Sequence, residues 1–101
     1  MKFKHQAGCF YQEDAQKHLI GKITYTHLKD QVISIDSTFV DPNYRNQGIA
    51  RALLEEVIQR ARQKYWHIIP VCPYARIVFE RESQLQDLLQ PVKKEDQDEA
   101  K

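Results

Sequence analysis

The stretch NYRNQGIARALL, residues 43–54, joins polar, turn-forming residues directly to the apolar positions of a helix. Arg45 carries a full positive charge, and Gly48 has no Cβ to keep a bulky group away from its amide. The first amides of a helix lack intrahelical partners, and the helix dipole adds about half a positive charge there. These features together predict a binding site for an anion such as a phosphate. The alternative is a loop in which the glycine only permits a tight turn.

Cys72 is the second residue whose type and place could do chemistry. It follows the apolar run HIIPV and precedes Pro73, a residue typical of the first helical position. A thiol just before a helix N-terminus lies where the helix dipole favours the thiolate. The alternative is a small buried thiol that packs in the core, as free cysteines commonly do. Tyr74 is a weaker candidate, because an aromatic residue in the first turn of a helix is commonly a core residue.

Other site chemistries lack the required spacing. A P-loop would end in Gly-Lys-Ser/Thr, and a dinucleotide fingerprint needs three glycines. A cysteine phosphatase loop would place Arg six residues after the cysteine, where this chain has Val78. We predict no metal site, because the histidines are scattered without the spacing that seats zinc; they are His5, His18, His27 and His67.

The pattern of apolar residues predicts the elements that must position these groups. Three strand-like runs come first, in residues 7–14, 17–28 and 32–40. In the third run, strict alternation places Asp36 with Thr38 on one face and Ile35 with Phe39 on the other. Pro42 ends this strand. A helix is predicted over residues 46–64, where apolar residues recur at helical spacing.

The remaining elements complete a small mixed domain. A short apolar strand precedes Cys72, a helix is predicted over residues 73–82, and Ser83 with Gln86 fits a capping box for a last short helix. The sequence therefore predicts an α+β fold in the order β-β-β-α-β-α. It consists of an antiparallel β-meander continued by a further strand, with the long central helix packed on the sheet.

Length and composition limit the function classes. The 101 residues suit one domain, which we place at residues 1–90, and the charged residues 91–101 predict a disordered tail. A formal net charge of +1 argues against a nucleic-acid binder with a broad basic surface. No apolar run is long enough for a membrane span, and no signal peptide is evident, so we expect a cytoplasmic protein with both cysteines reduced.

The stretch STFVDPNYRNQGIARALLEEVIQRAR resembles the central motif of the GNAT superfamily of acyl-CoA-dependent N-acyltransferases. That motif is a strand ending in Val-x-Pro, then Arg/Gln-x-x-Gly-x-Gly/Ala, then a long amphipathic helix. The named positions are filled here by Val40, Pro42, Arg45, Gly48 and Ala50. The resemblance covers roughly residues 18–81. A compact group within the superfamily is the most similar, because it also has a cysteine after the strand that follows the central helix.

The resemblance implies that the anion is the diphosphate of acetyl-CoA. In the family, the loop amides hold this diphosphate, and the end of the preceding strand bonds to the pantetheine arm and the acetyl group. Arg51 is long enough to reach a second phosphate oxygen, although an arginine on an exposed helix is usually only solvated. The implied cofactor-binding residues are Phe39, Val40, Arg45, Asn46, Gln47, Gly48, Ile49, Ala50 and Arg51.

The second family motif, Asn-x-x-Ala-x-x-x-Tyr, is altered in this chain. The aligned run is CPYARIVF, in which Cys72 replaces Asn and Phe79 replaces the Tyr that often acts as general acid. Two mechanisms stay open. The amine attacks the thioester directly while Cys72 or Tyr74 protonates the departing sulfur, or Cys72 first takes the acetyl group itself. Both Cys72 and Tyr74 are therefore candidate catalytic residues, and His27 or Asp36 could serve as the base.

The acceptor side is expected to be open, because no room exists for the helices that most family members carry between their first and second strands. Such a site suits a large acceptor, for example a protein amine. The leading hypothesis is an acetyl-CoA-dependent N-acyltransferase with an unidentified amine acceptor. The alternatives are a coenzyme A-binding or regulatory protein with little or no catalysis, and an interaction module that keeps the fold without the ligand.

Overall fold

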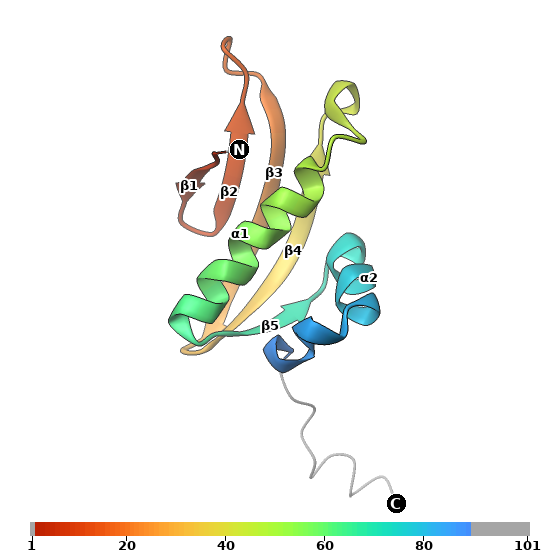
Figure 1. Cartoon of the computed structure of the whole chain (residues 1–101). Coiled ribbons are helices and arrows are strands. Elements are labelled where there is room, and N and C mark those ends of the chain that lie inside the picture. Colours follow the sequence, from red (N-terminus) through yellow and green to blue (C-terminus); the bar gives the residue numbers. More distant parts are fainter. Residues whose placement is uncertain (1, 90–101) are drawn as a thin grey trace, which may run out of the picture.

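The computed structural model describes residues 2–89, which form a five-stranded sheet with helices packed along it (Figure 1). The strands are β1 (Lys4–Gln6), β2 (Cys9–Glu13), β3 (Leu19–Lys29), β4 (Val32–Val40) and β5 (His67–Pro70). The helices are α1 (Ile49–Lys64) and α2 (Pro73–Arg81), and two 3₁₀ segments are η1 (Pro42–Tyr44) and η2 (Ser83–Leu88). The strands lie in chain order, with β1 to β4 antiparallel and β5 parallel to β4. Helix α1 supplies the crossover that a parallel pair requires.

The predicted α+β class is confirmed, and the predicted order lacks one strand. The extra strand is β1, whose residues KHQ carry no apolar alternation that would reveal it. Gly8 adopts φ 78° in the turn that folds β1 back onto β2, a conformation that glycine adopts easily. The predicted boundary at residue 90 and the predicted disordered tail, residues 91–101, lie outside the described residues.

A bulge in β4 decides which side chains face α1. Ile35 pairs with Tyr25, whereas the next pairing joins Ser37 to Thr24, so Asp36 is the extra residue. Beyond the bulge, Thr38 lies opposite the fully buried Ile23. Directly opposed residues share a face of the sheet. Thr38 therefore faces the helix side, and the alternation predicted from the sequence is wrong beyond Asp36 because a bulge shifts the period by one residue.

Helix α1 begins at Ile49, three residues later than predicted. Gly48 is its N-cap at φ 80°, and Asn46 also has a positive φ of 65°. A right-handed helix cannot pass through left-handed residues, so these two residues hold the loop open until Ile49. The helix ends at Tyr65, which is left-handed as well. Within residues 2–89, neither α1 nor any other helix has the length and apolar character to cross a membrane.

The core lies between the sheet and the apolar face of α1. Ile23, Ile35, Leu53 and Leu54 are all fully buried in it. Helix α2 and η2 lie beside α1 and add Ala75, Val78, Phe79, Leu85 and Leu88 to the same core.

The predicted capping box at Ser83 is wrong. The segment is a 3₁₀ helix, and its N-cap is Glu82, which makes no side-chain capping bond. The Gln86 side chain instead donates a hydrogen bond to the carbonyl oxygen of Phe79. This bond ties η2 to the end of α2, which a capping box at Ser83 would not do.

The contact between α1 and β3 leaves no room at Gly21. A Cβ there would lie 3.1 Å from Cγ2 of Ile49, 3.2 Å from the backbone oxygen of Phe39 and 3.3 Å from Cδ1 of Leu53. We predict that Gly21→Ala lowers the free energy of unfolding by about 1–3 kcal/mol, because the helix must move outward. Urea unfolding measures this loss. Lys29→Ala, at an exposed position of the same strand, should change stability by about 0.5 kcal/mol or less, and an equal effect in both variants would contradict the close approach.

Candidate active site

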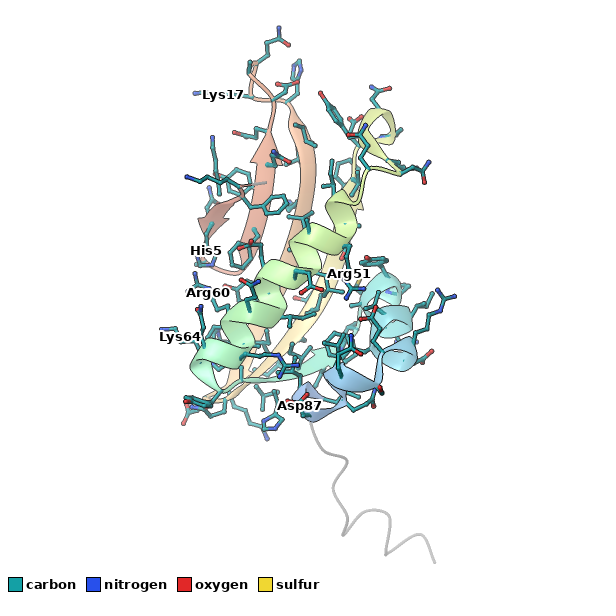
Figure 2. The ribbon with its side chains drawn as sticks, viewed as in Figure 1. His5, Lys17, Arg51, Arg60, Lys64 and Asp87 are labelled. Atoms are coloured by element: carbon teal, nitrogen blue, oxygen red, sulfur yellow. The ribbon has the colours of Figure 1, made fainter. Side chains whose placement is uncertain are left out.

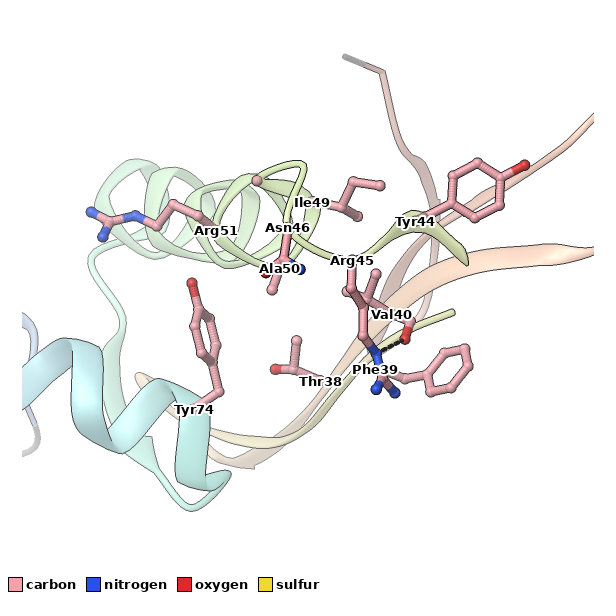
Figure 3. Close-up of a pocket in the computed structure, with 11 residues that line it drawn as sticks. Thr38, Phe39, Val40, Tyr44, Arg45, Asn46, Ile49, Ala50, Arg51 and Tyr74 are labelled. Carbon is pink, nitrogen blue, oxygen red and sulfur yellow. Dashed lines mark hydrogen bonds between the residues drawn. The ribbon is translucent and has the colours of Figure 1, made fainter. Parts of the chain in front are cut away.

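A cleft opens where β5 leaves β4. The two strands pair only as far as Ile35, whose carbonyl oxygen accepts the amides of both Val71 (3.0 Å) and Cys72 (2.9 Å). The chain then enters α2, so within the described residues the β5-facing edge of β4 from Asp36 to Val40 has no strand beside it. A cleft of about 480 Å³ lies here, between β4, the start of α1 and the first turn of α2 (Figure 3).

The lining of the cleft contains most of the residues predicted from the sequence. Phe39, Val40, Arg45, Asn46, Gly48, Ile49, Ala50, Arg51 and Tyr74 all line it. Gln47 and Cys72 do not. Thr38 and Tyr44 also line it and were not predicted as site residues. The bulge that turns Thr38 inward has no sequence signal, and Tyr44 was read only as part of a loop.

The backbone of β4 presents hydrogen-bonding groups to this cleft. The Asp41 amide donates to the Ile20 carbonyl oxygen (2.8 Å), so these opposed residues form a hydrogen-bonded pair. In an antiparallel ladder such pairs alternate with pairs whose backbone groups point away from the partner strand. Val40 and Thr38 therefore point their backbone groups toward the cleft. The Val40 carbonyl oxygen already accepts Nε of Arg45 (3.0 Å), which leaves the Val40 amide as a donor (Figure 3).

The start of α1 presents unused donors to the same space. The Ala52 amide bonds to the Gly48 carbonyl oxygen (3.0 Å), whereas the amides of residues 48–51 donate to no acceptor within the described residues. Gly48 supplies no capping side chain, and the first turn holds no acidic residue. A Cβ on Gly48 would meet no atom within 4 Å, so the space before it is open. Such a helix N-terminus favours an anion.

The guanidinium of Arg51 is held by two carboxylates at the side of the cleft. Its Nε donates to Glu55 (2.8 Å), and its two Nη atoms donate to the two oxygens of Glu82, one of them at 2.7 Å. These hydrogen bonds, above all the pair with Glu82, raise the pKa of Arg51 further above its ordinary value. The positive charge of Arg51 is thus largely balanced by protein groups.

Tyr74 and Cys72 differ in their access to the cleft. The Tyr74 ring stands on the first turn of α2, and its hydroxyl points toward α1 (Figure 3). Burial raises the pKa of this phenol, and the nearby Arg51 partly opposes the rise. Cys72 is only 2% exposed, and its Sγ lies 3.3 Å from Oγ1 of Thr38, which does line the cleft.

The two candidate bases lie in different surroundings. Asp36 is exposed at the bulge, where its carboxylate accepts hydrogen bonds from the hydroxyls of Thr26 and Ser34. His27 lies opposite Ile33, farther along β3, with its ring edge-on to Trp66 at 4.4 Å. Only Asp36 adjoins the point where β5 leaves the sheet.

Comparison with known proteins identifies the architecture around this cleft. A family model described as GCN5-related N-acetyl-transferase matches residues 9–88. The chain belongs to this family. The resemblance read from the central motif is therefore confirmed, and with it the enzyme class and the cofactor: the protein is an acyltransferase of the GNAT family that uses acetyl-CoA.

Solved structures agree with this assignment. A GCN5-like protein from Staphylococcus aureus, solved by NMR, has 29% sequence identity and a TM-score of 0.75, over 91% of this chain and 90% of that one. A GNAT-family acetyltransferase from Staphylococcus aureus Mu50 has 24% identity and a TM-score of 0.55, over 61% of this chain and 40% of that one. A Mycobacterium tuberculosis protein in complex with CoA has 21% identity and a TM-score of 0.54, over 62% and 40%.

The three structures differ in how much of their own length this chain covers. The first structure has nearly the length of this chain, whereas the chain spans only about two fifths of the other two. Those two show the shared fold alone. None of the curated proteins compared with this chain matches it.

The ion pair at the side of the cleft gives a pH-dependent prediction. The hydrogen bonds from Arg51 hold the pKa of Glu82 below its ordinary value of 4.5. A carboxyl whose pKa is lowered on folding stabilises the protein above its unfolded pKa, and this contribution is lost as the pH falls through the folded pKa. We predict that wild type exceeds Glu82→Gln in stability at about pH 7 and that the gap narrows below pH 4.5. Urea unfolding across this range measures it, and a gap constant down to about pH 3 would contradict the pairing.

Proposed function

We propose that this acetyltransferase moves the acetyl group of acetyl-CoA directly to an amine held at the mouth of the cleft. One observation carries the proposal: unused amides of α1, the unpaired edge of β4 and the Tyr74 hydroxyl all face a single space. The first can receive a diphosphate, the second an extended arm, and the third a departing sulfur. The three lie in the order in which these groups occur along the cofactor.

The cofactor placement follows from the donors. The diphosphate lies before the amides of residues 48–51, with Arg45 close by and Val40 anchoring its Nε. The pantetheine arm lies along the cleft edge of β4, where an extended ligand can bond to Thr38 and Val40 as an added strand would. Further residues that we assign to the cofactor are Phe39, Asn46, Gln47, Ile49 and Ala50.

The transfer proceeds in one chemical exchange at the carbonyl carbon. The neutral amine nitrogen forms a bond to the thioester carbon, and the oxygen takes a negative charge that the Thr38 amide stabilises. The carbon–sulfur bond then breaks, and the departing thiolate receives a proton from Tyr74. A base takes the proton lost by the amine. Solvent restores the proton to Tyr74 afterwards.

Tyr74 suits the role of acid because it lines the cleft with its hydroxyl pointing toward α1, and burial keeps the pKa of that hydroxyl above its ordinary value. The phenol therefore stays protonated at neutral pH and gives up its proton only as charge develops on the sulfur. Phe79, which aligns with the usual tyrosine of the family, is 1% exposed and does not line the cleft. Tyr74 thus offers a hydroxyl from the same helix at a different position.

Cys72 suits a supporting role better than the role of acyl carrier. Its thiol is buried behind Thr38, and a thioester at that atom would need the side chain to move into the cleft. We therefore assign Cys72 to holding the Thr38 hydroxyl at the cleft wall. The double-displacement route, in which Cys72 is acetylated, is the mechanism that this arrangement disfavours.

Asp36 is the base that we assign. Its carboxylate is exposed beside the point where the cleft begins, and the Thr26 and Ser34 hydroxyls orient it. Residues 14–18 join β2 to β3 without a helix, so no helix inserted between these strands covers the acceptor side. This arrangement favours a large acceptor, and we propose an amine on a protein or peptide.

A second function is favoured by the altered second motif. With Phe79 in place of the usual tyrosine, the protein could bind coenzyme A as a regulatory protein with little or no catalysis. The two functions differ in whether any amine releases the coenzyme thiol faster in the presence of the protein. Turnover that depends on Tyr74 would exclude the second function.

We predict that calorimetry detects acetyl-CoA binding and detects no binding of S-acetylpantetheine, which lacks the diphosphate. Gly48→Val should weaken acetyl-CoA binding at least about tenfold, because it adds a branched side chain before the amides at a positive φ. Lys64→Ala, at an exposed position at the far end of the same helix, is the matched control. Equal binding of both compounds would contradict the proposed diphosphate site.

We predict that Tyr74→Phe lowers kcat about 100-fold with little change in the KM for acetyl-CoA, because it removes the acid and keeps the ring. Cys72→Ala should keep turnover within about tenfold, since the loss of support for Thr38 leaves the acid in place. Coenzyme thiol release with a panel of peptide amines measures both. Loss of turnover in Cys72→Ala, together with an acetyl adduct on the wild-type thiol, would replace direct transfer with the acyl-cysteine route.

A further inference from the structure

The Arg51–Glu82 ion pair joins the two walls of the cleft. Arg51 lies in the first turn of α1 (Figure 2). Glu82 is both the C-cap of α2 and the N-cap of η2. The guanidinium meets the carboxylate with two parallel hydrogen bonds, a geometry that fixes distance and angle together. Nε2 of Gln84 also donates to Oε1 of Glu82 (2.7 Å), the oxygen that accepts Nη2 of Arg51.

We propose that this ion pair positions the Tyr74 hydroxyl for the reaction and that Arg51 is not a ligand of the diphosphate. This inference rests on the acid role proposed for Tyr74. The ion pair fixes the end of α2 against α1, and Tyr74 stands at the other end of that short helix. Its ring therefore keeps a set distance from α1 as long as the helix is held at both ends. Arg51 and Glu82 are positioning residues in this account.

The hydrogen bonds of Arg51 argue against a role in phosphate binding. Three of its nitrogens already donate to carboxylates, two to Glu82 and one to Glu55. A phosphate would have to displace a two-bond contact with Glu82 or accept a guanidinium whose charge is already balanced. The amides of residues 48–51, by contrast, donate to no acceptor within the described residues, so a phosphate would displace nothing there.

The charges around Tyr74 make the proposal measurable. Burial has the largest effect on the Tyr74 pKa and raises it; of the nearby groups, Arg51 lowers it, while Glu82, Glu55 and Cys72 raise it. Removing either member of the ion pair therefore changes the Tyr74 pKa in a direction that depends on the member removed. The sign of each shift tells whether both charges lie close enough to act on the hydroxyl, and the kinetic test below tells whether they position it.

The first test is NMR titration of protein labelled at the tyrosine Cζ carbon, with Tyr74→Phe used to assign the resonance. Glu82→Gln should lower the Tyr74 pKa, and Arg51→Gln should raise it. Asp87→Asn is the matched control: Asp87 forms another ion pair with α1, through Arg62 at 2.8 Å, and does not line the cleft. It should leave the Tyr74 pKa unchanged. Shifts of the same sign in both test variants, or no shift in either, would overturn the proposal.

The second test is acetyl-CoA affinity by calorimetry. Both Arg51→Gln and Glu82→Gln should bind acetyl-CoA within about twofold of wild type. If Arg51 were a diphosphate ligand, Arg51→Gln would weaken binding at least about tenfold, and Glu82→Gln would free the arginine and tighten it. That pair of results would overturn the proposal.

The third test is a double-mutant cycle on kcat with an amine on which wild type turns over. Glu82→Gln should lower kcat about tenfold alone and have no further effect in the Tyr74→Phe background, because it acts through that hydroxyl. Independent losses that add would overturn the positioning role. If Tyr74→Phe alone has no effect on kcat, or no amine is acetylated, the acid role fails instead, while the titration still decides whether the ion pair sets the surroundings of Tyr74.

Discussion

The end of pairing between β4 and β5 at Ile35 is the constraint on which the site depends. One carbonyl oxygen receives the amides of Val71 and Cys72, and this double acceptance turns the chain out of the sheet. Continued pairing along that ladder would use the backbone groups that Thr38 and Val40 present to the cleft. The bulge at Asp36 follows at once, so the strand that borders the cleft also changes its face there. Sheet geometry therefore creates the opening before any side chain contributes.

The start of α1 completes the opening with donors that the protein leaves unused. Glycine at the N-cap supplies no oxygen, and the first turn supplies no carboxylate. A typical surface helix would satisfy these amides with a capping side chain, which stabilises a helix by about 0.5–2 kcal/mol. Here the helix is held instead by its buried face and by the close approach of Ile49 and Leu53 to Gly21. Stability from packing thus leaves the helix end free for an anion.

Much of this arrangement could be predicted from the sequence because it is local. Patterns of consecutive residues predict three of its parts: the helical spacing from Ile49 to Lys64, the strand end before Pro42 and the glycine loop between them. What could not be predicted depends on contacts between distant segments. The bulge at Asp36 is a matter of register between β3 and β4. Residues 4–6 form the strand β1 only because they pair with β2.

The hydrogen-bonding partners of charged residues could not be predicted from the sequence either. Arg51 was assigned to a phosphate oxygen from its place after the glycine loop, and nothing near it in the sequence predicts its partner Glu82, which lies 31 residues away. The burial of Cys72 follows from the packing of Thr38 across the bulge. The start of α1 was predicted too early because the positive φ of Asn46 is not evident from its neighbours.

Amide NMR spectra recorded during titration with acetyl-CoA test the central claim most directly. The account predicts that the resonances of Gly48, Ile49, Ala50 and Val40 shift together and saturate with one affinity, and that their hydrogen exchange slows. It also predicts that addition of inorganic diphosphate shifts the first three and leaves Val40 unchanged. Large shifts confined to other parts of the chain, with these four amides unchanged, would contradict the account.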